Sequence, residues 1–176
     1  MHKRPPTIFF WFSAAALVLC AAWCLSTFDE PFLPLWPAFA LAVGIFPVHF
    51  RTVTGLIRWS DSAGRTRREG FSAWLKEEMP RAWQLIGGAL FFVFWLLAAT
   101  ALWTLRHGGP AIVNGHTFAR NHGSLTPISL SVYHELQLAE QRLLTAVAGA
   151  FYLLGVLYNA VVLRSSQRRY TTTRSP

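Results

Sequence analysis

Four stretches of almost uninterrupted apolar residues alternate with polar segments along the chain. They cover residues 7–27, 32–50, 83–105 and 143–163, and none of them contains Asp, Glu, Lys or Arg. A helix needs about 20 such residues to cross the hydrocarbon core of a bilayer, which is about 30 Å thick. The pattern predicts an all-α membrane protein: a four-transmembrane-helix bundle that forms one integral membrane domain over residues 1–176.

Composition agrees with this prediction. The chain is 53% hydrophobic and 14% charged, whereas soluble domains carry roughly 25% charged residues. The first apolar stretch follows His-Lys-Arg, as in a signal peptide, but Trp23 breaks the small-residue pattern of a cleavage site. We therefore expect it to remain as a membrane span.

The polar segments differ sharply in positive charge. Lys and Arg number two before the first stretch, seven in residues 51–82 and four in the tail, against three in residues 106–142. By the positive-inside rule, both termini and the 51–82 loop are expected on the cytoplasmic side. The basic residues are mostly Arg, which is typical of a GC-rich bacterial genome and points to a bacterial plasma membrane.

The net charge of +8 also raises the question of a nucleic-acid partner. The excess cations flank apolar stretches, so membrane orientation and binding to anionic headgroups account for them. We expect a lipid bilayer with anionic headgroups as the partner, and no nucleic acid.

The 51–82 segment contains a second helical pattern. Pro37 and Pro47 predict a kinked second span, which residues 53–57 extend until "SDSAG" ends it. In "GFSAWLKEEMP", apolar residues recur at helical spacing opposite charged ones. This predicts a short helix in the headgroup plane or a docking face for a partner protein, with these candidate contacts: Arg67, Arg68, Phe71 and Trp74.

Residues 106–142 hold a compact loop on the opposite, outer side. Asn114 and Gly115 between short β-prone runs form a strong hairpin signal, and Asn121-His122-Gly123 is a second turn candidate. A two- or three-stranded meander over residues 111–128 follows from these turns. The final helix is expected to begin with Ser131 as N-cap and Glu135 in its first turn, and to continue to Leu163 with its first ten residues outside the bilayer.

Four histidines lie in or beside this loop: His107, His116, His122 and His134. Imidazole is a common zinc ligand, so they are metal candidates, although no H-E-x-x-H motif or Cys partner accompanies them. A pH-sensitive interface and ordinary turn residues remain as alternatives. No cofactor is expected.

The run "RNHGSLTPISLSVY" resembles a loop of small uncharacterised bacterial multi-pass membrane proteins, in which an Asn-His-Gly turn precedes a Tyr-bearing helix. The matching positions are Asn121, His122, Gly123, Thr126, Ser129 and Tyr133. The resemblance covers about a tenth of the chain. It implies a shared local fold and no known activity.

The apolar stretches offer little chemistry. They hold no ionisable acid for a proton relay, and Cys20 and Cys24 lie four residues apart on one helix face, where they indicate packing with Ala16. Asn159 and Gly155 are likewise interpreted as packing residues.

The expected function is that of a non-catalytic membrane interaction or accessory protein, which binds a membrane-protein partner or a second copy of itself. Its outer contact residues would be Asn114, Gly115, Arg120, Asn121, His122, Gly123 and Tyr133. The alternatives are a subunit of an oligomeric transporter or channel, with Thr100 and Asn159 along its path, and a metal-dependent membrane enzyme that uses the loop histidines.

Overall fold

A computed structural model describes residues 5–28, 35–62, 76 and 79–172. The helices are α1 (Pro5–Ser26), α2 (Leu35–Val43), α3 (Ile45–Ser62), α5 (Arg81–Leu105) and α6 (Leu130–Thr172), and the strands are β1 (Gly109–Val113), β2 (His116–Asn121) and β3 (Ser124–Pro127). Four helical segments are long and apolar enough to span a membrane, α2 and α3 together forming the second. The predicted fold class is confirmed, and the segments are consistent with a multi-pass membrane protein.

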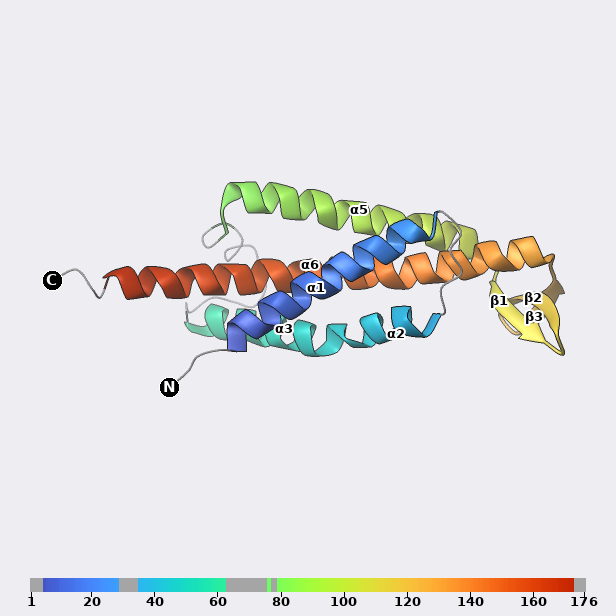
Figure 1. Cartoon of the computed structure of the whole chain (residues 1–176), viewed down its shortest axis with the longest axis horizontal. Coiled ribbons are helices and arrows are strands. Elements are labelled where there is room, and N and C mark those ends of the chain that lie inside the picture. The colour runs from blue at the N-terminus through green and yellow to red at the C-terminus, as the bar shows by residue number, and fades with distance from the viewer. Residues whose placement is uncertain (1–4, 29–34, 63–75, 77–78, 173–176) are drawn as a thin grey trace.

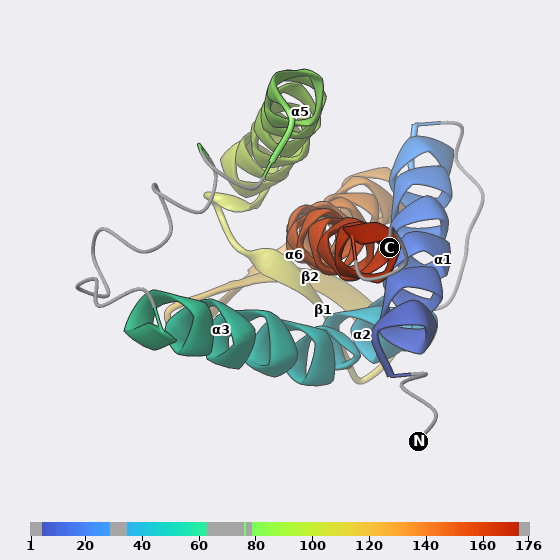
Figure 2. The ribbon, with the colours of Figure 1, turned by 90° about the vertical axis from the view of Figure 1, so that its left-hand side faces the viewer.

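Helix α6 lies at the centre of the bundle. Helices α1, α2, α3 and α5 all pack against it and surround it when viewed along its axis (Figure 2). The sheet lies beside the first turns of α6, at the end of the bundle opposite to the one where α1 begins and α6 ends (Figure 1). We call these the sheet end and the terminus end.

The second span is kinked, as its prolines predict. Helix α2 ends at Val43 and α3 begins at Ile45, and Pro47 has no N–H to offer to the carbonyl one turn earlier. On the turn before the break, the Tyr152 hydroxyl of α6 donates a hydrogen bond to the Leu41 carbonyl at 2.8 Å. A side chain of the central helix thus bonds the second span next to its break.

Small residues allow the helices to approach α6 closely. Ala16, Cys20 and Cys24 are almost fully buried, and both cysteines are free. They pack in clusters with alanines of α6 at positions 146, 148 and 150. The predicted packing role of this stripe is confirmed, and it agrees with the small-residue interfaces of membrane helices.

Helix α6 begins differently from the prediction. The Val132 N–H bonds the Ser129 hydroxyl at 3.3 Å, so the N-cap is Ser129 and the expectation of Ser131 was wrong. Glu135 consequently lies beyond the first turn, which holds no acidic residue. The cause is the sheet, because Ile128 is still bonded to Thr117 of β2 and the chain turns into the helix immediately afterwards.

Helix α6 is also longer than a bilayer requires. Its 43 residues extend over about 65 Å at 1.5 Å per residue, and it runs beyond the predicted end at Leu163. We take the charge-free part, residues 143–163, as its membrane-spanning segment. The turns before residue 143 support the sheet.

Candidate functional site

The sheet is formed by two tight hairpin turns. Asn114 and Gly115 have φ values of 51° and 80°, and His122 and Gly123 have values of 46° and 87°. Positive φ at both central positions is the signature of the turn that matches the twist of two-residue hairpins. The result is an antiparallel sheet in the order β1-β2-β3, which confirms the meander.

The two faces of this sheet have different surroundings. Ala111 is buried, and a Cβ at Gly109 would lie 3.0 Å from Glu140 Oε1 of α6, so this face packs on the central helix. Side chains alternate along a strand, and the opposite face is therefore directed away from α6. We call it the open face; its central residues are Pro110, Ile112, Thr117, Ala119 and Thr126.

The open face is uncharged and carries an exposed apolar side chain. Ile112 is 59% exposed, and its cross-strand partner is Thr117. Ala119 pairs with Thr126 on the neighbouring strands. Sequence reasoning missed this face, although the two hairpin turns fix the alternation. The missing information was which side of the sheet α6 covers.

Both free edges of the sheet carry a proline where an N–H would point outward. The Ile128 N–H donates to the Thr117 carbonyl, so Thr117 and Ile128 are a hydrogen-bonded pair. Hydrogen-bonded and non-hydrogen-bonded pairs alternate along an antiparallel ladder. Leu125 and Pro127 therefore direct their backbone away from β2, as do Pro110 and Ile112 on β1. Because proline has no N–H, each edge offers one outward donor, which disfavours the addition of another strand.

The four histidines are not gathered at one point. His116 is the first residue of β2 and His122 directly follows its last, so the two lie about 20 Å apart at the rise of a strand. His107 Nε2 accepts a hydrogen bond from Arg106 Nε at 2.7 Å, and the His134 ring packs edge-on against Tyr133. Within the described ranges, no three His, Cys, Asp or Glu side chains are placed to hold a metal ion together.

The predicted interaction residues are dispersed as well. Asn114 and Gly115 form one turn, whereas Asn121, His122 and Gly123 lie at the other end of β2. Arg120 is exposed and pairs with Gly109 and Leu125, on the side of the sheet that faces α6. The second group of candidates lies outside the described residues: Arg67, Arg68, Phe71 and Trp74.

A cluster of polar side chains forms hydrogen bonds between the end of α1 and α6, next to the part of α6 that contacts the sheet. Trp23 Nε1 donates to Gln141 Oε1 at 3.1 Å, and Arg142 donates to the Thr27 hydroxyl and carbonyl. Glu140, which contacts the sheet at Gly109, lies outside the 143–163 span, and burial raises the pKa of its carboxyl group. These bonds join α1 to the part of α6 that lies between the 143–163 span and the sheet.

A lateral groove of about 400 Å³ separates α1 from α2. Its lining includes Phe12, Leu19, Trp23, Trp36 and Tyr152. The volume falls within the range of about 300–1,000 Å³ found for small-molecule sites. However, the Tyr152 hydroxyl is engaged with the Leu41 carbonyl, and the lining that the structure describes is almost entirely apolar.

The two polar residues considered for a transport path do not share one. Thr100 is exposed on α5 and bonds the Leu97 carbonyl of its own helix at 2.8 Å. Asn159 is fully buried on α6 and donates to the Gly155 carbonyl at 2.8 Å. A pore lined by both residues of one chain is therefore not present among the described residues.

Compared with known protein families, with curated proteins and with solved structures, the chain shows no match.

Proposed function

We propose that this chain is a non-catalytic integral membrane interaction protein that recognises another membrane protein through the open face of its sheet. The observation that carries the proposal is the packing of the sheet on the part of α6 that lies outside the span. Helix α6 continues beyond the 143–163 span, and the sheet packs on this extension through Ala111 and Gly109. Because the sheet packs on an extension of a membrane-spanning helix, its open face would stay at a fixed distance from the bilayer.

The proposed orientation places the sheet end outside the cell and the terminus end in the cytoplasm. The basis is the excess of Lys and Arg in the segments at the terminus end, which the positive-inside rule assigns to the cytoplasm. The proposed location is the plasma membrane of a bacterium.

The chemistry of the open face indicates how a partner would bind. Strand addition is disfavoured because Pro110 and Pro127 remove outward donors from the edges. The exposed side chain of Ile112 and the small side chains around it instead suit a flat apolar contact, and apolar residues are enriched at the centres of protein interfaces. A neighbouring membrane protein is the favoured partner because the sheet sits next to the bilayer.

Site-specific photo-crosslinking in native membranes tests this proposal. The photoreactive residue is placed at Ile112 or Thr126 on the open face, and at His116, which is exposed but belongs to the other face, as the matched control. We expect a discrete crosslinked membrane protein from the open-face positions and none from His116.

A second experiment examines the contact itself. Ile112→Asp places a charge in the proposed interface and should abolish the crosslink from position 126, whereas His116→Asp should not change it. Equal crosslinking from both faces, a product that consists of two copies of this chain, or substrate turnover by the purified protein would each overturn the proposal.

A further inference from the structure

Two arginines of α3 lie on the side of that helix that faces two polar residues of α6, at the terminus end of the bundle. Arg51 directly follows the charge-free part of the second span, and Arg58 lies two turns later on the same side of α3. Between them, at Gly55, a Cβ would collide with the hydroxyl of Tyr158. Along this side of α3 the order is therefore Arg51, then Gly55 with the Tyr158 hydroxyl against it, then Arg58.

Asn159 positions the guanidinium of Arg51. The buried amide donates to the Gly155 carbonyl at 2.8 Å, which turns its Oδ1 toward α3, where it accepts a hydrogen bond from Arg51 Nε at 3.3 Å. The guanidinium also lies over the Phe9 ring of α1, 4.5 Å from its centroid. One edge and one face of the Arg51 group are thus occupied by protein.

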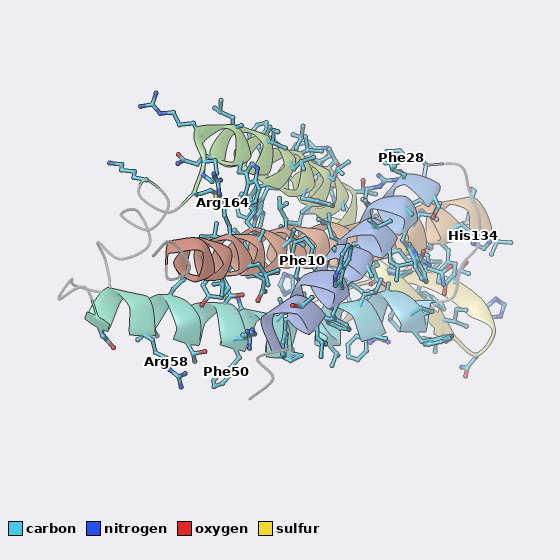
Figure 3. The ribbon with its side chains drawn as sticks, turned by 60° about the vertical axis from the view of Figure 1, so that its left-hand side comes forward. Phe10, Phe28, Phe50, Arg58, His134 and Arg164 are labelled. Atoms are coloured by element: carbon cyan, nitrogen blue, oxygen red, sulfur yellow. The ribbon has the colours of Figure 1, made fainter. Side chains whose placement is uncertain are left out.

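The remaining donors of the two arginines are available. Among the residues that the structure describes, no acceptor contacts the two Nη atoms of Arg51, and Arg58 is exposed without a side-chain partner. Figure 3 shows Arg58 projecting from α3 into the surroundings of the bundle.

We propose that Arg51 and Arg58, one helical turn before and after Gly55, form a binding site for the phosphate group of an anionic phospholipid in the leaflet at the terminus end. Guanidinium groups suit this ligand because their planar fork pairs with two phosphate oxygens at once.

The position of the site favours a lipid phosphate over a soluble one. Phe46 and Phe50, one turn apart and immediately before Arg51, are 74% and 73% exposed, as expected for side chains in contact with acyl chains. A bound lipid would therefore place its chains against these rings and its phosphate at the arginines. The site does not depend on the sheet or on its proposed partner.

The test uses the full chain, purified in an uncharged detergent, and follows thermal unfolding. The probes are dioctanoyl phosphatidylglycerol, dioctanoyl phosphatidylcholine and inorganic phosphate at one ionic strength. We expect a saturable rise in Tm with phosphatidylglycerol only. Arg58→Gln should weaken its apparent affinity about five-fold, because one cation near a membrane surface contributes about 1 kcal/mol.

Two further variants keep the result interpretable. Arg51→Gln should weaken binding at least as much, while Arg81→Gln removes the same charge from an exposed position at the start of α5 and should leave the affinity unchanged. Arg58 contributes no described packing contact, so its replacement reports on binding without unfolding the protein. An equal loss in Arg58→Gln and Arg81→Gln, or an equal Tm rise with phosphatidylcholine or inorganic phosphate, would overturn the site.

Discussion

The guanidinium of Arg142 on α6 caps the C-terminal turn of α1 at Thr27. Arg142 Nε donates to Thr27 Oγ1 and Nη2 donates to the Thr27 carbonyl, both at 3.1 Å. The same guanidinium lies over the Phe28 ring, 4.0 Å from its centroid. A cation at this position satisfies a free carbonyl and complements the helix dipole, so the first and last spans are joined at the sheet end.

Arg142→Gln should destabilise the bundle. Hydrogen bonds to charged groups contribute about 1.5–3 kcal/mol, and the substitution removes two of them together with the contact to Phe28. The measurement is unfolding of the detergent-solubilised protein. Arg120→Gln removes the same charge from an exposed residue of β2 at the same end and should have little effect; equal destabilisation of both variants would contradict the capping role.

Gly149 and Gly88 should respond in opposite ways to replacement by alanine. At Gly149 a Cβ would lie within 3 Å of three atoms of the Phe94 ring, and overpacking of this kind costs about 1–3 kcal/mol. At Gly88 no atom lies within 4 Å, so Ala should stabilise the helix by up to about 1 kcal/mol. Unfolding measurements on the two variants distinguish close packing from helix propensity; the same sign for both would contradict this packing.

Glu140→Gln should make the protein more stable at neutral pH and leave it nearly unchanged at pH 4. Burial raises the pKa of Glu140 above its ordinary value of 4.5. The folded state therefore holds the proton more tightly than the unfolded state, and this carboxyl lowers stability as the pH rises from 4.5 through the folded-state pKa. Tm measured against pH for both proteins is the test, with Glu135→Gln, an exposed residue on the same helix, as the control. A variant that loses stability at pH 7 would show that the ionised carboxylate is instead favoured.

Restoring the missing edge donors should promote association between sheets. Pro110→Thr and Pro127→Thr each add an outward N–H to an edge strand, and unprotected edges pair with other strands. We expect the double variant to form dimers or larger species at concentrations at which the parent chain does not, as measured by size-exclusion chromatography with light scattering. A Thr126→Ser variant, altered on β3 without a new donor, should behave like the parent. Unchanged association of the double variant would show that the prolines do not protect the edges.

The predicted spans, the kink and the meander came from local patterns. Apolar runs without charge specify helices in a bilayer because the cost of unsatisfied backbone and buried charge leaves few alternatives. Pro47 marks the break in the second span because a missing N–H acts within one turn. The Asn-Gly and His-Gly turns specify the hairpins because positive φ is a property of one or two residues.

The start of α6 could not be predicted so closely. Ser129 and Ser131 are equally suitable N-caps by residue type, and the choice between them depends on the bond between Ile128 and Thr117, which joins residues eleven positions apart. The candidate sites depend on contacts between residues that lie even further apart in the sequence. Arg51 meets Asn159 across 108 positions, and no repeating pattern in the chain relates the two.

The sequence by itself thus determined how many helices are long enough to span a membrane, where the second one bends and where the sheet turns, because each of these depends on residues within a few positions of one another. Only the tertiary structure decided that α6 is the central helix, which face of the sheet it covers, and that the four histidines do not converge while Arg51, Tyr158 and Asn159 do. These outcomes depend on which side of each helix packs inward, and that is set by close contact among glycine, alanine and aromatic side chains from distant parts of the chain.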